Sequence, residues 1–226
     1  MDYLNIEKIH FTEALKYFAN NKNILCDLND LMNKTLIDEI SIENTKDKYK
    51  DDKDDSGEST CESDMSTNYD SSIMSVMEFT MDYNNPFEGS FYIALIPNTD
   101  VENNNKIVVG FVTIILADTF YLYTQKSTSN INVADSIYSI SGVGVDFKYR
   151  NNGICSKLLK RIINDFPTVD IYLSVFPGNI AAFTCYKKIG FVENQDLEDK
   201  EDPIKYMTLI HHKKLKVDFF QYHLPF

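Results

Sequence analysis

The chain has 226 residues and a mass of 26.1 kDa, which is enough for one α/β domain with a sizeable core. Its 34 Asp and Glu residues outnumber 22 Lys and Arg, and the net charge of −12 argues against a nucleic-acid partner, because affinity for phosphates comes from basic side chains. No apolar run reaches the roughly 18 residues of a membrane span and no signal segment opens the chain, so we predict a soluble, intracellular and by default cytoplasmic protein without a membrane partner.

The cysteine pattern predicts free thiols and no metal site. The four cysteines are far apart and form no CxxC pair, and the four histidines are not at metal-ligand spacing from them. The cysteines are Cys26, Cys61, Cys155 and Cys185.

The first 40 residues predict one strand and two helices. Residues 3–9 are predicted to form a strand, and residues 11–21 a helix with Leu15 and Phe18 on one side. A second helix is predicted over 24–40. The whole chain, 1–226, is interpreted as a single domain.

An acidic insertion follows, at residues 43–72. Its first part, 43–64, holds nine acidic residues against four lysines and few apolar groups, so its burial would not offset the entropy of ordering it. We favour a disordered insertion, and the alternative is an acidic arm that attracts a basic substrate. Residues 211–226 are interpreted as a C-terminal extension.

The middle of the chain predicts three strands. Residues 90–96 and 106–116 form a strand pair, and the second strand is apolar on both faces, as in the centre of a sheet. The strand at 136–147 changes the parity of its apolar positions, which predicts a β-bulge near Ser141 and Gly142. A strand buried on both sides is the alternative.

The last third alternates helix and strand. A helix from Ile154, ended by Pro167, and a strand at 169–176 complete a right-handed βαβ unit with the bulged strand. The next helix, 179–189, has Asn179 as its N-cap and stops at Gly190. Strands at 191–194 and 204–210 close the sheet.

The loop before the first of these helices, "YRNNGIC", could bind an anion. The first N–H groups of a helix have no intrahelical partner, and the helix dipole makes that end positive. Gly153 lets the backbone approach a ligand closely, and Arg150 adds a fixed cation. Together they would suit a diphosphate, although an ordinary loop has the same composition.

Two motifs in order extend this reading. "RNNGIC" resembles the Q/R-x-x-G-x-G/A loop of the GNAT superfamily of acetyl-CoA-dependent N-acetyltransferases, and "NIAAFTCYKKIGF" resembles its N-x-x-A-x-x-x-Y-x-x-x-G-F signature. The resemblance covers residues 90–210 and departs at Cys155, where the family has glycine or alanine. It implies an α/β fold with a mixed, mostly antiparallel twisted sheet, a central parallel pair of strands that splay apart, and flanking helices.

The resemblance also implies acetyl-CoA as co-substrate, with no metal, and a set of residues that hold it. Its pantetheine arm would lie between the splayed strands, where a backbone N–H near Val143 could polarise the thioester. The implied cofactor-binding residues are Val143, Gly144, Val145, Arg150, Asn151, Asn152, Gly153, Ile154, Cys155, Asn179 and Ala182.

Tyr186 is the implied catalytic residue. It matches the family tyrosine that protonates the leaving thiolate, a step suited to a phenol because it is protonated at neutral pH; ordinary packing in the helix is the alternative reading. Cys185 should point about 100° away from it, into the core. No base is evident: Glu78, Asp82, Asp118, Asp146 or a water chain remain open.

The function implied is transfer of an acetyl group to a primary amine of a protein or peptide, a polyamine or an amino sugar. The negative charge favours a cationic acceptor. Two alternatives are an inactive acyl-CoA-binding module that acts through protein contacts and, less favoured, an unrelated nucleotide-binding domain. The sequence leaves the oligomeric state open.

Overall fold

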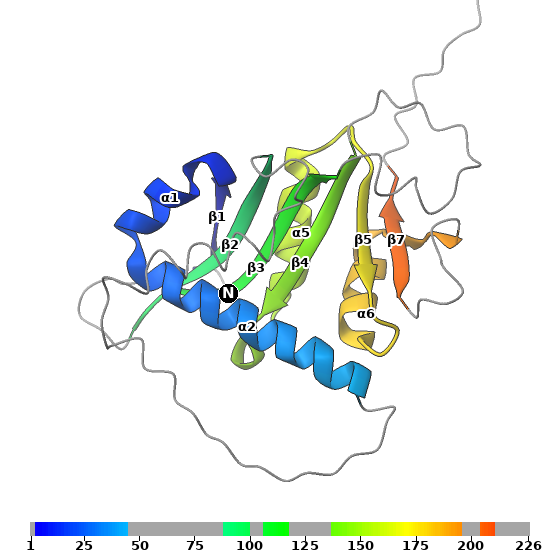
Figure 1. The fold of residues 1–226 in the computed structure, drawn as a ribbon, viewed down its shortest axis with the longest axis horizontal. Coiled ribbons are helices and arrows are strands. Elements are labelled where there is room, and N and C mark those ends of the chain that lie inside the picture. The colour runs from blue at the N-terminus through cyan, green and yellow to red at the C-terminus, as the bar shows by residue number, and fades with distance from the viewer. Residues whose placement is uncertain (1–2, 45–87, 100–105, 118–136, 196–203, 211–226) are drawn as a thin grey trace, which may run out of the picture.

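A computed structural model describes residues 3–44, 88–99, 106–117, 137–195 and 204–210, and the remaining residues are drawn as grey trace in Figure 1. The predicted acidic insertion begins inside a helix, because α2 runs through Asn44. The rest of that insertion and the predicted C-terminal extension lie outside the described residues. Within the described part of the chain, no helix combines the length and apolar character needed to cross a bilayer.

One seven-stranded sheet, ordered β1-β2-β3-β4-β5-β7-β6, organises the fold. All neighbouring strands are antiparallel except β4 and β5, which are parallel. This confirms the predicted mixed sheet with a single central parallel pair. The strands are β1 (Asn5–His10), β2 (Gly89–Pro97), β3 (Lys106–Ala117), β4 (Ile137–Val145), β5 (Ile171–Val175), β6 (Val192–Glu193) and β7 (Lys205–Leu209).

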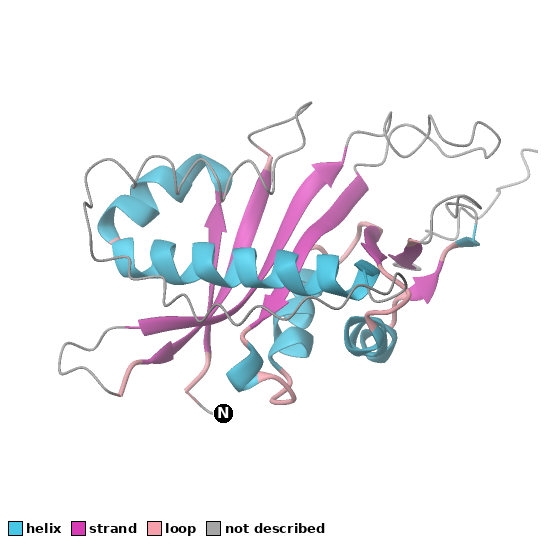
Figure 2. Ribbon diagram, turned by 60° about the horizontal axis from the view of Figure 1, so that its bottom comes forward, coloured by secondary structure: helices cyan, strands magenta, loops and turns pink. Residues whose placement is uncertain are grey.

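Helices cover both faces of the sheet (Figures 1 and 2). Helices α1 (Phe11–Asn20) and α2 (Lys22–Asn44) lie on one face, where they pack with Phe91, Phe111 and other side chains of β2 and β3 into a first core. Helices α5 (Ile154–Asp165) and α6 (Ile180–Ile189) pack on the other face in a second core. Strand β3 contributes to both cores, which confirms its predicted central place.

The buried side of α1 excludes one of its large apolar residues. Phe11, Ala14 and Phe18 are buried, but Leu15 is 59% exposed. Leu15 lies about 100° around the helix from Ala14, at the edge of the apolar stripe, and the sheet contacts the side centred on Ala14 and Phe18.

The predicted β-bulge is confirmed. In the β3–β4 ladder Thr113 pairs with Gly142 and Ile114 pairs with Ile140, so Ser141 has no partner on β3. Ile140 and Val143 consequently both face the second core although they are three residues apart. The extra residue lets β4 bury apolar side chains on one face on both sides of the bulge.

The parallel ladder between β4 and β5 is short. It pairs residues 138–140 of β4 with residues 171–173 of β5 and ends at Ile140 and Leu173. Strand β4 continues to Val145 paired only with β3, so its edge toward β5 is unpaired over the last residues. The splayed pair predicted from the family resemblance is therefore present in the fold.

Asp165, at the end of α5, joins that helix to β1 and β2. Its carboxylate accepts a hydrogen bond from the hydroxyl of Tyr92 (2.8 Å) and forms ion pairs with Lys8 (3.3 Å) and Arg161 (3.2 Å). Burial by itself would raise the pKa of Asp165, but the Tyr92 hydrogen bond and the Lys8 charge outweigh it and hold the pKa below its usual value.

We expect Asp165→Asn to lower the free energy of unfolding by about 1 to 2 kcal/mol at pH 7, because a charge-assisted bond and the attraction to Lys8 are lost. A carboxyl whose pKa is lower in the folded than in the unfolded protein stabilises the fold above the unfolded-state pKa. This stabilisation is lost as pH falls through the folded-state pKa. Urea denaturation at pH 7 and at pH 3 tests this: the difference between parent and variant should shrink at the lower pH. An equal difference at both pH values would contradict it.

Candidate functional site

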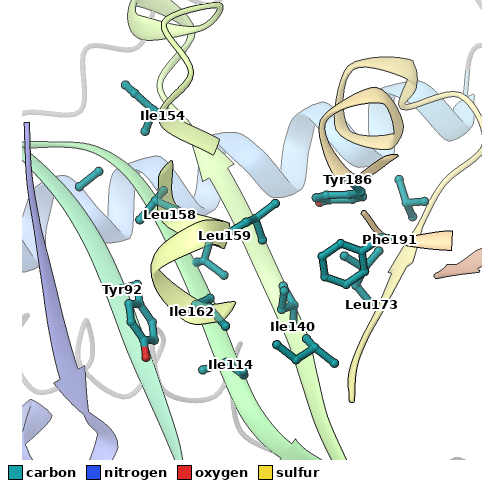
Figure 3. Packing of buried hydrophobic residues seen from close by; sticks show 14 of the residues in the cluster. Tyr92, Ile114, Ile140, Ile154, Leu158, Leu159, Ile162, Leu173, Tyr186 and Phe191 are labelled. Atoms are coloured by element: carbon teal, nitrogen blue, oxygen red, sulfur yellow. The ribbon is translucent and has the colours of Figure 1, made fainter. Parts of the chain in front are cut away.

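A cavity of about 90 Å³ opens where β4 and β5 separate. Its walls combine residues from the bulge in β4, from the end of β5 and from α6, and Figure 3 shows Tyr186 with Phe191 and Leu173 beside Ile140. The described lining residues are Ile140, Ser141, Gly142, Val143, Leu173, Ser174, Val175, Phe176, Asn179, Tyr186 and Ile204.

Tyr186 is held rigidly at the wall of this cavity. Only 6% of it is exposed, and its ring packs against Phe191 with the centroids 6.1 Å apart. The helix that carries it is fixed at both ends: the side chain of Asn179 accepts a hydrogen bond from the N–H of Ala182 (3.1 Å), and Gly190 ends it with a left-handed φ of 114°. The predicted cap and stop are thus confirmed, and Tyr186 is presented to the cavity from a defined position.

The loop after β4 has two left-handed residues. Asn151 has a φ of 65° and Gly153 a φ of 74°, and the side chain of Asn152 donates to the carbonyls of Tyr149 (3.1 Å) and Arg150 (3.2 Å). Nothing in the described structure lies within 4 Å of where a Cβ of Gly153 would stand. The loop therefore presents backbone to open space.

The start of α5 is uncapped by side chains. Gly153 is its N-cap residue and offers no side-chain hydrogen bond, so the first N–H groups of α5, at the positive end of the helix dipole, have no side-chain cap. The Nε of Arg150 donates to the carbonyl of Val145 (3.1 Å), which ties this cation to the end of β4. Backbone donors, the positive end of the helix dipole and a cation therefore come from one short segment of the chain, a combination that suits an anion.

The prediction of free thiols was wrong for two cysteines. Cys155 and Cys185 form a disulfide between the first turn of α5 and α6, with the Cα atoms 6.9 Å apart. The two residues are 30 apart in sequence, and only the packing of α5 against α6 brings them together. Cys185 does pack in the second core, as expected, and Cys26 forms no disulfide. Cys61 lies outside the described residues.

The three predicted residues of β4 face different ways. Val143 lines the cavity and Val145 packs in the second core. Gly144 faces α2, where a Cβ would clash with Phe111 and Thr35. A side chain at Gly144 would push α2 away from the sheet, so glycine at this position allows α2 to pack closely against β4.

Of the four acidic residues considered as the general base, only Asp146 lies in the described part of the chain, and its carboxylate has a structural role. Its carboxylate accepts from the N–H of Lys148 (2.8 Å) and caps the short 3-10 helix Phe147–Tyr149, and it is not on the described cavity lining. Glu78, Asp82 and Asp118 lie outside the described residues.

Two polar residues of the lining, Ser141 and Ser174, were not predicted as site residues. Serine in a strand carries no signal of its own. The β4–β5 ladder ends at Ile140 and Leu173, so each serine is the first residue of its strand beyond the ladder.

Comparisons with known proteins show the family of this chain. A model of the acetyltransferase (GNAT) family matches residues 58–191, more than half of the chain, and the chain belongs to that family. Its reaction class is therefore acetyl transfer, with acetyl-CoA as the co-substrate. A search of the curated proteins finds no match.

Solved structures of similar fold include three acetyltransferases. A GNAT-family acetyltransferase of Staphylococcus aureus Mu50 is 18% identical over 91% of this chain and 97% of its own (TM-score 0.44). An acetyltransferase of Thermus thermophilus is 10% identical over 91% and 96% (TM-score 0.48). The PaiA N-acetyltransferase of Thermoplasma acidophilum, solved with coenzyme A, is 13% identical over 91% and 97% (TM-score 0.47).

Arg150→Glu should weaken CoA binding at least tenfold, on the order of 1.4 kcal/mol or more, because the change places a negative charge beside the diphosphate. Calorimetry with CoA measures this. Lys157→Glu, the same charge change on the exposed side of α5 one turn into the helix, is the control and should have a smaller effect. Equal affinity of parent and Arg150→Glu would remove Arg150 from the cofactor site.

Proposed function

We propose that this protein is an N-acetyltransferase that moves the acetyl group of acetyl-CoA to a primary amine. One observation carries the proposal: the Tyr186 cavity opens where β4 separates from β5, and the loop after β4 leads to a helix start, at Gly153, that has no side-chain cap. A ligand with an anionic handle at one end and a reactive group at the other fits that arrangement.

Different residues of the proposed site bind different parts of acetyl-CoA. The loop and helix start at 150–155 bind the diphosphate through backbone N–H groups and Arg150. The pantetheine arm runs along 143–145, on the edge of β4 that β5 leaves unpaired. Asn179 and Ala182 fix the start of α6 against the arm.

The steps of acetyl transfer follow from the groups that line the cavity. The amine nitrogen attacks the thioester carbon, and an N–H near Val143 stabilises the oxyanion that forms. The carbon–sulfur bond then breaks, the electron pair goes to sulfur, and the hydroxyl of Tyr186 gives the thiolate its proton. The proton lost by the amine passes to a general base that stays unassigned or to water, and a proton from water restores the phenol of Tyr186.

A screen of acceptors tests the proposal. The parent protein is incubated with acetyl-CoA and, in turn, peptides, polyamines and amino sugars, and both the released CoA thiol and the acetylated product are measured. We expect acetylation of at least one amine class above the rate without protein. Tight CoA binding with no acetylated product from any class would favour an acyl-CoA-binding module that acts through protein contacts.

A further inference from the structure

We propose that Ser141 and Ser174 form the acceptor subsite and bind the incoming amine in its uncharged form, which makes an α-amino group the preferred acceptor. This inference rests on the proposed function and narrows its substrate class. It starts from the position of the two hydroxyls in the sheet.

The two serines lie on neighbouring strands at the point where β4 and β5 separate. The parallel ladder ends at Ile140 and Leu173, so the next residue of each strand is a serine. Ser141 is also the bulge residue that β3 skips, and both serines are exposed and line the cavity. Among the described residues, no side chain or backbone group bonds to either hydroxyl. The pair is therefore open to a ligand.

The serines approach the cavity from the face opposite Tyr186. On β5, Leu173 and Val175 are buried in the second core, so Ser174 between them points to the other face. Ser141 follows Ile140, which is also in the second core, and points the same way as Ser174. Tyr186 enters the cavity from the second core. A thioester held between the strands would have the phenol on one side and the hydroxyl pair on the other.

That placement suits an attacking amine. A nucleophile adds to one face of the planar thioester, and a neutral amine has N–H groups that two serine oxygens can accept. Holding the nitrogen by two such bonds orients its lone pair toward the carbon. The serines are thus positioning residues for the acceptor, while Tyr186 serves the leaving group.

The side chains that line the cavity determine which protonation state of the amine the site binds. The four polar side chains that the structure places on the wall are Ser141, Ser174, Asn179 and Tyr186, and all four are uncharged. Only the neutral amine can attack, because an ammonium has no lone pair, and two uncharged hydroxyls provide no counter-charge that would favour the ammonium. With pKa values of about 8 for an α-amine and about 10.4 for a lysine, roughly a tenth of the first and less than a thousandth of the second is neutral at pH 7.

Substitution of the hydroxyls tests the positioning. Ser141→Ala and Ser174→Ala should each raise the Michaelis constant for the acceptor roughly 3- to 10-fold, the loss of one hydrogen bond, and should leave the Michaelis constant for acetyl-CoA and the melting temperature unchanged. Ser139→Ala is the matched control, because Ser139 is on the same strand but pairs with Ile115 and Tyr172 and does not line the cavity.

A pair of peptides tests the substrate class. Both have one sequence with a single lysine: one has a free α-amine and an acetylated lysine, the other an acetylated α-amine and a free lysine. We expect the parent to prefer the α-amine at least about tenfold in kcat/KM at pH 7, and the preference to shrink as pH rises to 9, because the α-amine is then already mostly neutral while the neutral fraction of the lysine still increases.

Three results are distinct. Equal or faster acetylation of the lysine peptide, or no change in acceptor Michaelis constant in the double serine variant, overturns the inference while leaving amine acetylation in place. A rise in the Michaelis constant for acetyl-CoA alone would assign the serines to the cofactor instead. Failure of the parent to acetylate any amine in the screen above overturns the proposed function, and this subsite with it.

Discussion

Tyr186→Phe should reduce the turnover number by about 10²- to 10⁴-fold while acetyl-CoA affinity and folding stay as in the parent. The variant keeps the ring that packs on Phe191 and removes only the hydroxyl at the cavity wall. The loss falls on turnover because the proton moves as the carbon–sulfur bond breaks, so the hydroxyl acts in the transition state and not in the bound complex.

Single-turnover rates with a reactive amine measure this step without interference from product release. Tyr206→Phe, on β7 and off the described cavity lining, is a control of the same chemistry. If Tyr186→Phe reacts as fast as the parent, Tyr186 is a packing residue and bound water is the acid.

Cys185→Ala should lower the free energy of unfolding by about 3 to 4 kcal/mol, since the Cys155–Cys185 bond closes a loop of about 30 residues and restricts the unfolded chain. Denaturant unfolding of the oxidised parent and the variant measures the difference. Adding a thiol reductant should bring the parent close to the variant and leave the variant unchanged.

The control for this comparison is Cys26→Ala, because Cys26 forms no disulfide. Its response to reductant should match that of the parent. A parent whose unfolding is the same with and without reductant would show that the bond contributes nothing to stability. A change of acetyl-CoA affinity in Cys185→Ala is a separate readout of how far the bond holds the start of α5 in place.

Local signals predicted much of this fold. The parity change in β4 located the bulge, because a strand with one buried face must add a residue to reverse its faces. Asn179 and Gly190 marked the ends of α6 because each has a local backbone role. The loop at 150–155 was predicted from residue types and motif spacing alone, and its left-handed Gly153 fits that reading.

What could not be predicted depends on contacts between distant segments. The Cys155–Cys185 bond needs the packing of α5 on α6, and the Ser141–Ser174 pair needs the register of β4 on β5. The exposure of Leu15 could not be predicted either, because a residue at the edge of an apolar stripe is buried or exposed according to where the sheet lies. The base stays open because three of the residues considered lie outside the described structure.

The start of α5 and the Tyr186 cavity are two different parts of the site, so the group that α5 would hold is not the group that reacts. In the proposed arrangement the handle that α5 and Arg150 hold is the same before and after the acetyl group leaves. CoA therefore keeps most of the contacts that acetyl-CoA had and competes for the free protein. The rate of such an enzyme depends on the ratio of acetyl-CoA to free CoA. It therefore changes with the concentration of acetyl-CoA as well as with that of the acceptor.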